Sequence, residues 1–207
     1  MIISWYGQFC FKIQTGEKVV LIDPYSPRNA GLRGPNYKAT ILVLTNPEEI
    51  KIAQKDSKDE CFLISGPGEY ESKNIFVYGT DAGEDKKPLT IYQIIVDNIR
   101  IGVLGEINKT LTDGQLEKLD GIDVLLIPIG GKGMIDAEKA VKIVHQIEPK
   151  ITIPCCYKIK GLNIPLASLD IFLKEMGAKN PETMEKLSLH KKDLEQIENK
   201  IIILEPK

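Results

Sequence analysis

The chain lacks several features that would mark a special class of protein. It contains no apolar run near the roughly 20 residues needed to cross a bilayer. Its start, Met1 to Trp5, is typical of a strand, with no basic segment, apolar core and cleavage site in succession. The net charge is -2 and lysine is scattered among glutamate, so the basic stripe that binds nucleic acid is missing. The sequence therefore predicts a cytoplasmic protein that binds neither membrane nor nucleic acid.

Cysteine is also scarce and irregularly placed. The four cysteines are Cys10, Cys61, Cys155 and Cys156, and their spacing matches no disulfide framework. The adjacent pair cannot close an unstrained disulfide, so we expect reduced thiols. Hydrophobic residues make up 43% of the 207 residues, enough for an ordered core without cross-links. We expect one domain over residues 1–207.

Short apolar runs rich in β-branched residues fill the first half and predict strands. Turns such as 14–17 and 97–98 are too short for helical crossovers and favour antiparallel hairpins. The glycines at 66–68 indicate a turn, with Glu69 and Glu71 solvated. The predicted strands span residues 2–5, 10–13, 19–22, 41–44, 62–64, 75–78, 90–96 and 100–104.

Amphipathic helices appear in the second half. Thr112 and Gln115 form a capping-box pattern ahead of a short helix that runs through Leu119. A second helix begins at Asp136 and stops at Pro149, and a third closes at Gly177. Strands are expected at 124–129 and 151–153, with a final hairpin from 187–189 and 201–204. These elements predict an α/β fold, a four-layer αββα sandwich of two mostly antiparallel sheets flanked by helices.

Six segments resemble, in order, the small zinc-dependent hydrolases of the metallo-β-lactamase superfamily. The opening Trp-Tyr-Gly-Gln-Phe-Cys-Phe at 5–11 is similar to that family's Trp-Tyr-Gly-His-Ser-Cys-Phe. The others are Leu-Ile-Asp-Pro-Tyr at 21–25, Ile-Ser-Gly-Pro-Gly-Glu-Tyr-Glu at 64–71, Gly-Val-Leu-Gly-Glu at 102–106, Leu-Ile-Pro-Ile-Gly-Gly at 126–131 and Ile-Pro-Cys-Cys-Tyr-Lys at 153–158. The resemblance implies the metallo-β-lactamase fold and a site for two metal ions, held mainly by histidines, that activates water.

The residues at the expected ligand positions differ from the family pattern. The strand at 41–44 leads to Asn46 and Glu48 instead of a histidine cluster, and residues 79–84, with Glu84, contain no histidine. The only histidines, His145 and His190, read as surface residues. The resemblance therefore implies a cleft without its usual ligands, lined by Gln8, Asp23, Asn46, Glu48, Glu84, Glu106, Cys156 and Tyr157.

Two functions remain open. The first is a degenerate member, a pseudoenzyme without catalytic residues, metal or cofactor, that binds a small ligand or protein partner as a scaffold or regulator. In it, Lys51 or Lys132 would bridge the carboxylates. The alternative is a hydrolase with magnesium, manganese or zinc at a carboxylate-rich site. Whether the chain is an enzyme is left undecided, and a homo-oligomer or a mixed oligomer with an intact paralogue fits either reading.

Two local features have both a functional and a structural interpretation. Cys156 has no histidine to deprotonate it, so an inert thiol is expected instead of a nucleophile. The glycines around Lys132, at 130–133, precede a helix and favour either a plain turn or an anion site.

Overall fold

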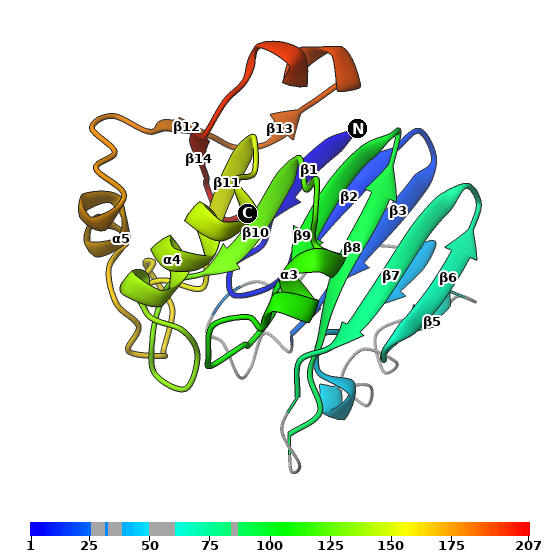
Figure 1. Cartoon of the computed structure of the whole chain (residues 1–207), viewed down its shortest axis with the longest axis horizontal. Helices are drawn as coiled ribbons and strands as arrows, with labels where there is room; N and C mark the ends of the chain where they lie inside the picture. The colour runs from blue at the N-terminus through cyan, green and yellow to red at the C-terminus, as the bar shows by residue number, and fades with distance from the viewer. Residues whose placement is uncertain (26–31, 33–38, 50–60, 84–86) are drawn as a thin grey trace.

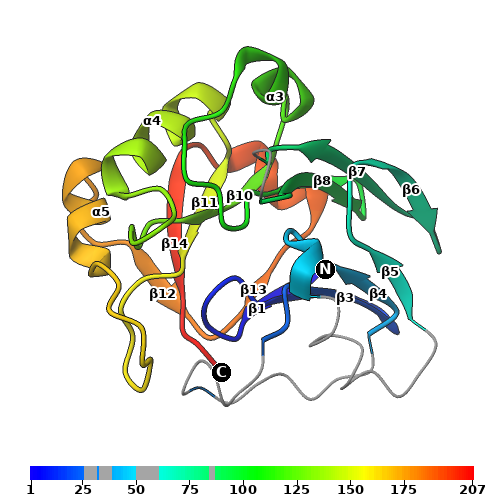
Figure 2. The ribbon, with the colours of Figure 1, turned by 90° about the horizontal axis from the view of Figure 1, so that it is seen from below.

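Two β-sheets packed face to face form the centre of the protein. The computed structural model describes residues 1–25, 32, 39–49, 61–83 and 87–207. The two sheets and a layer of helices can be followed in Figure 1 and, turned by 90°, in Figure 2. This arrangement is the predicted α/β sandwich, in which the apolar faces of the two sheets bury each other.

The first sheet has six strands and is built mainly from the N-terminal part of the chain. Its strand order is β13-β1-β2-β3-β4-β5. The strands are β1 (Ile2–Trp5), β2 (Phe11–Thr15), β3 (Lys18–Ile22), β4 (Ile41–Val43), β5 (Phe62–Ile64) and β13 (Leu187–Ser188). The pairs β3 with β4 and β4 with β5 are parallel, whereas the hairpins β1-β2 and β2-β3 are antiparallel.

The second sheet has eight strands in the order β12-β14-β11-β10-β9-β8-β7-β6. They are β6 (Gly68–Ser72), β7 (Ile75–Asp81), β8 (Thr90–Val96), β9 (Ile99–Val103), β10 (Val124–Pro128), β11 (Ile151–Cys155), β12 (Glu182–Met184) and β14 (Lys200–Leu204). β6 to β9 form an antiparallel meander, and the pairs from β9 to β12 are parallel. The sheets are thus mixed, with parallel pairs where crossovers permit them.

Three α-helices lie on the outer face of the eight-stranded sheet: α3 (Asp113–Lys118), α4 (Ala137–Ile147) and α5 (Leu169–Glu175). All three were predicted, including the Thr112 and Gln115 capping box and the Asp136 N-cap. Two short 3-10 helices, η1 (Pro47–Glu49) and η2 (Lys191–Gln196), complete the described elements. Across the described residues, no helix has the length and apolar character that crossing a bilayer requires.

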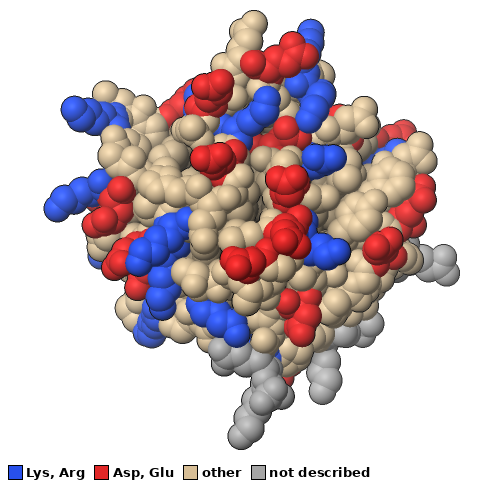
Figure 3. Space-filling model, viewed as in Figure 1, with Lys and Arg blue, Asp and Glu red and all other residues tan. Residues whose placement is uncertain are grey.

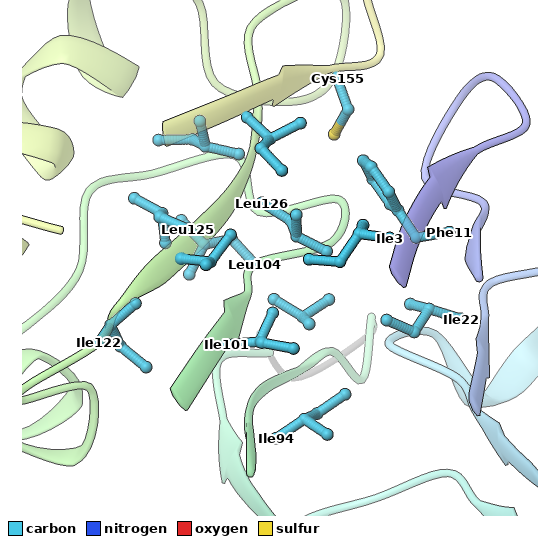
Figure 4. Packing of buried hydrophobic residues seen from close by; sticks show 14 of the residues in the cluster. Ile3, Phe11, Ile22, Ile94, Ile101, Leu104, Ile122, Leu125, Leu126 and Cys155 are labelled. Atoms are coloured by element: carbon cyan, nitrogen blue, oxygen red, sulfur yellow. The ribbon is translucent and has the colours of Figure 1, made fainter. Parts of the chain in front are cut away.

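The core lies between the sheets. Ile3, Phe11 and Ile22 of the first sheet point toward the second, where Ile101 and Leu126 face them (Figure 4). These five side chains are at most 2% exposed. Because such burial removes apolar area from water, this interface supplies most of the driving force for folding.

One sequence prediction fails at the level of strand pairing. The strands at 187–189 and 201–204 do not form a hairpin. β13 pairs with β1 in the first sheet, whereas β14 pairs with β11 and β12 in the second. Glu69 and Glu71 are exposed, as predicted, but they lie in a strand that the sequence did not predict, β6, whose register with β7 sets Tyr70 opposite Val77.

α5 ends in a hydrogen-bonded turn at Gly177, which has a positive φ of 66°. The amide of Ala178 donates to the carbonyl of Leu173 at 2.9 Å, and that of Gly177 donates to Lys174 at 3.1 Å. This pair of bonds is the Schellman motif, in which glycine is favoured because it has no Cβ.

Replacing Gly177 by alanine is expected to lower the free energy of unfolding by about 1 kcal/mol, because alanine is strained at positive φ. Gly114 is the matched control, because it lies in α3 at an ordinary φ and an added Cβ would meet nothing within 4 Å. Gly114→Ala should leave stability unchanged or raise it by up to about 1 kcal/mol. Denaturant unfolding measures both, and equal effects would contradict this account of the turn.

A buried carboxylate joins η2 to the second sheet. Asp123 is 4% exposed, and its carboxylate accepts hydrogen bonds from the backbone amide of Arg100 at 2.9 Å and from the ammonium of Lys191 at 2.8 and 3.1 Å. A buried carboxylate is stable only when it is hydrogen-bonded or paired, so Lys191 holds η2 in place.

Lys191→Ala is therefore expected to destabilise the protein by about 1 kcal/mol, a modest value because the ammonium is partly exposed. The neighbouring Lys192 is exposed and serves as the control, with an expected change for Lys192→Ala within about 0.5 kcal/mol. Urea unfolding of both variants tests the difference, and an undiminished midpoint for Lys191→Ala would rule out this role.

Candidate functional site

The candidate site lies at one end of the sandwich, where strands of both sheets finish. Asp23 and Thr45 follow the parallel strands β3 and β4 in the first sheet. Glu106 and Cys156 follow β9 and β11, which both run parallel to β10 in the second sheet. Figure 2 shows the loop after β1 and the short helix η1 at this end. Carboxyl ends of parallel strands meet at one edge of a sheet, so polar residues there are brought together.

Asp23 and Thr45 form the best-ordered contact at this end. One carboxylate oxygen of Asp23 accepts a hydrogen bond from the backbone amide of Thr45, and the other accepts one from its hydroxyl, both at 2.7 Å. Asp23 is 6% exposed and Thr45 is 2% exposed. Both carboxylate oxygens thus have a donor, as burial requires.

Thr45 also ties the first sheet to the second. Its carbonyl accepts a hydrogen bond from the amide of Thr90 at 2.9 Å, and the preceding carbonyl, of Leu44, accepts one from the Tyr92 hydroxyl at 2.9 Å. Gly105 packs so closely that a Cβ there would lie 2.3 Å from the Thr45 hydroxyl oxygen. Only glycine fits at this point, because the φ of Gly105 is also positive, at 59°.

Gln8 and Cys156 meet across the site. The Cys156 thiol donates to the Gln8 side-chain carbonyl at 3.8 Å, a long contact typical of sulfur. The Trp5 indole N–H donates to the Gln8 backbone carbonyl at 2.9 Å and fixes the loop. The Nε2 of Gln8 is buried and has no hydrogen-bond partner among the residues the structure describes. That nitrogen is an unsatisfied donor, which costs free energy unless a ligand or water accepts from it.

Glu106 is held by a lysine. Lys87 Nζ lies 2.8 Å from Glu106 Oε2, with side-chain exposures of 41% and 33%. The bridging cation is therefore Lys87, where the sequence suggested Lys51 or Lys132. Lys132 is exposed on the loop before α4, and Lys51 lies outside the described residues.

The remaining polar residues of the predicted cleft, Asn46, Glu48 and Glu84, are not seen in contact with Gln8, Cys156 or Glu106 in the described part of the chain. Asn46 Oδ1 accepts a hydrogen bond from the Glu48 amide at 3.0 Å, so Asn46 caps η1. The Glu48 side chain is exposed and makes no hydrogen bond or ion pair with another described residue. Glu84 lies outside the described part of the chain.

Burial controls the titration of the groups on the Cys156 side. Burial, and to a smaller extent the charge of Glu106, raises the pKa of the Cys156 thiol well above its usual value. Burial likewise raises the pKa of Tyr157, whose ring lies 5.1 Å from that of Trp5. At neutral pH, Cys156 is a thiol and Tyr157 a phenol.

Three predicted cleft residues share an uncommon backbone conformation. The φ angles of Gln8, Asp23 and Cys156 are 51°, 40° and 52°. Non-glycine residues at positive φ carry strain, and such strain concentrates at functional sites. The fold therefore holds the backbone of Gln8, Asp23 and Cys156 in a strained conformation, and this sets the direction in which each side chain leaves the backbone.

The donor groups do not fit the pair of metal ions that the resemblance implies. Within the described ranges, no group of three or more His, Cys, Asp or Glu side chains could hold a metal. Both oxygens of Asp23 are bonded to Thr45, Glu106 is paired with a cation, and Cys156 is protonated. Zinc requires several convergent nitrogen, sulfur or carboxylate donors in their deprotonated forms.

The other candidate features have structural roles. The amide of Gly131 donates to the carbonyl of Ile135 at 3.1 Å, and the Asp136 carboxylate accepts from the Lys139 amide at 3.0 Å. An anion at the start of α4 would face this carboxylate, so the glycine-rich segment is a turn. His145 and His190 are both exposed, as predicted.

Known proteins share this architecture. A family model for the beta-lactamase superfamily domain matches residues 2–156. A UPF0173 protein of Pyrococcus abyssi is 26% identical over 78% of this chain and 85% of its own length. A UPF0173 metal-dependent hydrolase of Methanocaldococcus jannaschii is 23% identical over 88% of this chain and 95% of its own length.

Solved structures agree with this match. A proposed zinc-dependent hydrolase of the metallo-beta-lactamase superfamily from Thermotoga maritima has a TM-score of 0.85 and 27% identity, covering 100% of this chain and 99% of its own. A metallo hydrolase of Ignicoccus hospitalis has a TM-score of 0.64 at 17% identity, over 91% of this chain and 98% of its own, which shows the fold alone. Because the family match spans most of the sequence and the fold agrees, this chain belongs to the metallo-β-lactamase superfamily.

Proposed function

We propose that this protein keeps the fold of the metal-dependent hydrolases but uses the end of the sandwich to bind a small polar ligand or a partner without the family's two-metal centre. The observation that carries the proposal is the Lys87–Glu106 ion pair at 2.8 Å. By the sequence resemblance, Glu106 stands where the family has a bridging aspartate that holds metal, and a lysine ammonium beside this carboxylate repels a metal cation. The donors that would complete a metal site are bonded elsewhere or protonated.

The buried amide of Gln8 supports a binding role. Its Nε2 is a donor without a described partner, and it lies next to the Cys156 thiol. A ligand with a carbonyl or carboxylate oxygen would satisfy it, since burial makes an unpaired donor costly. In this proposal Gln8 and Glu106 contact the ligand, and the buried Cys156 thiol supports the Gln8 side chain.

A second candidate function is favoured by the relatives. Two UPF0173 proteins, from Methanocaldococcus jannaschii and Thermoplasma acidophilum, are named metal-dependent hydrolases. These names support the hydrolase reading more than the pseudoenzyme reading. In this candidate a carboxylate-rich site would hold magnesium, manganese or zinc, and Glu106 would be a ligand after release from Lys87.

Metal content distinguishes the two candidates. Protein purified without chelator is expected to contain less than one divalent ion per chain by plasma mass spectrometry, because its donors are engaged. Lys87→Met tests the ion pair: it removes the ammonium and leaves Glu106 free, so this variant should contain more divalent metal than the wild type if the pair excludes metal. Two ions per chain in the wild type, lost in Glu106→Gln, would overturn the binding proposal in favour of the hydrolase.

Metal addition gives an independent result for the second candidate. If zinc, manganese or magnesium raises hydrolysis of phosphodiester, lactone or thioester substrates, and Glu106→Gln removes the gain, the hydrolase is supported. Lys139→Met, a change at a partly exposed residue of α4, is a control that should leave any such gain unchanged. A flat response to every ion and substrate class would eliminate this candidate.

Thiol chemistry tests the protonated state of Cys156. Because burial raises the pKa of Cys10, Cys155 and Cys156, their reactive thiolates are absent at neutral pH. Ellman's reagent should modify at most the half-buried Cys61 in the native protein, and all four cysteines in concentrated guanidinium chloride. Cys61→Ser should abolish the native signal and Cys156→Ser should leave it. Rapid native labelling at Cys156, located by mass spectrometry, would contradict this assignment.

A further inference from the structure

The end of the second sheet farthest from β12 exposes aromatic side chains. Phe76 and Tyr78 of β7 are 37% and 36% exposed, and both lie on the outer face of the sheet. Ile95 of β8, directly opposite Phe76 in the register, is partly exposed on the same face. Residues of one strand that are two positions apart share a face, so these three side chains form one apolar patch.

Helices protect the rest of this face but not the patch. α4 and α5 lie toward β10, β11 and β14, and α3 is linked to β8 by a hydrogen bond in which the Lys118 carbonyl accepts from Gln93 Nε2 at 3.5 Å. Among the described residues, no helix covers β6 or the exposed part of β7. Figure 3 shows uncharged surface over β7 with acidic side chains at the β6 border.

Each exposed ring has a carboxylate as its cross-strand neighbour. The register of β6 and β7 sets Glu69 opposite Tyr78 and Glu71 opposite Phe76. Both glutamates are exposed. Opposite residues in a sheet have Cβ atoms about 4.5–5.5 Å apart, so each glutamate is the immediate neighbour of an aromatic residue on the same face. A carboxylate beside an aromatic ring suits a guanidinium, which pairs with the acid and stacks on the ring.

β6 is also the edge strand of the eight-stranded sheet. Its outer side has no paired strand in the described part of the chain, and β5 is likewise the edge of the first sheet. Free edge strands accept an added strand through their backbone groups. A strand added beside β6 would place every second side chain over the outer face, next to Glu69 and Glu71.

A second copy of this chain fits the edge poorly. Symmetric antiparallel pairing of two β6 strands centred on Tyr70 would set Glu69 of each copy opposite Glu71 of the other. Like charges directly opposite each other destabilise a sheet. The charge on β6 therefore disfavours self-association and favours a basic occupant.

We propose that β6 is a docking edge for an extended, basic segment of a partner protein, with arginine or lysine at alternate positions. The backbone of the partner adds a strand to the sheet on the free side of β6, and its basic side chains lie beside Glu69 and Glu71 and extend across β6 toward Tyr78 and Phe76. This surface is separate from the end of the sandwich that carries Gln8 and Glu106, and it does not depend on what that site binds.

The test uses a short fluorescein-labelled synthetic peptide in which arginine alternates with valine or threonine, titrated with the full-length protein by fluorescence anisotropy. Saturable binding is expected, weakened by added salt because the ion pairs are exposed. Glu69→Lys with Glu71→Lys should weaken it about tenfold, since two cross-strand charge pairs become repulsive. Glu117→Lys with Glu138→Lys, which makes the same charge change on α3 and α4, should leave it within about twofold.

Further variants separate the ring contribution from the charge. Phe76→Ala should weaken binding about threefold, because the cation loses its aromatic face. A peptide with glutamate in place of arginine should not bind. The proposal is overturned if the wild type shows no saturable binding, or if both double variants weaken it equally. It is also overturned if the protein forms a dimer that the β6 variant dissociates, because a second copy would then be the occupant.

Discussion

The hydrogen bonds between Asp23 and Thr45 are the constraint on which this structure depends. A carboxylate that is 6% exposed must be satisfied within the protein, and both of its oxygens are satisfied by one residue at 2.7 Å. The backbone carbonyl of Thr45 also accepts a hydrogen bond from the amide of Thr90, and Gly105 packs against the Thr45 hydroxyl. One residue therefore joins the ends of β3 and β4 to β8 and to the turn after β9. The two sheets are aligned by this junction, and the polar groups above it are positioned as a result.

The junction of Asp23 and Thr45 has a structural role that is compatible with either proposed function. The sequence predicts Asp23 among the residues that line the cleft, and the structure bonds its carboxylate to Thr45 where the sheets meet. Gln8 and Cys156 both have a positive φ, and an amide and a protonated thiol are poor metal ligands. The Glu106 carboxylate pairs with Lys87. In our proposal these groups are engaged in hydrogen bonds and an ion pair and do not hold a metal.

Much of the fold could be predicted from local patterns. The capping box at Thr112, the N-cap at Asp136 and the closing glycine at Gly177 each define a helix end through a few neighbouring atoms, and all three were predicted. Pairing of distant strands depends on packing that no local pattern records, so the separation of β13 and β14 into different sheets was missed. The sequence predicts Glu69 and Glu71 to be solvated, and both are exposed, but it does not predict strand β6, which has one partly buried aromatic residue, Tyr70, between two glutamates. The alternation of exposed glutamates with the partly buried Tyr70 was the signal in the sequence that could have predicted this strand.

The sequence could indicate which residues line the candidate site, but not which residues they contact. The motifs identified Gln8, Asp23, Glu106 and Cys156, and the structure brings Gln8 to Cys156 across 148 positions of sequence. Thr45 and Lys87 were missed. Thr45 could have been found, because it follows a strand expected beside the one that ends at Asp23, whereas Lys87 belongs to no motif and is recognised only by its distance from Glu106.

A crystal structure of the protein grown with zinc or manganese, with anomalous diffraction recorded at the metal edge, tests the central claim most directly. Our account predicts that Lys87 Nζ stays on Glu106, that Asp23 stays on Thr45, and that no anomalous peak lies among these side chains. Two strong peaks coordinated by Glu106 and its neighbours, with Lys87 turned away, would contradict it.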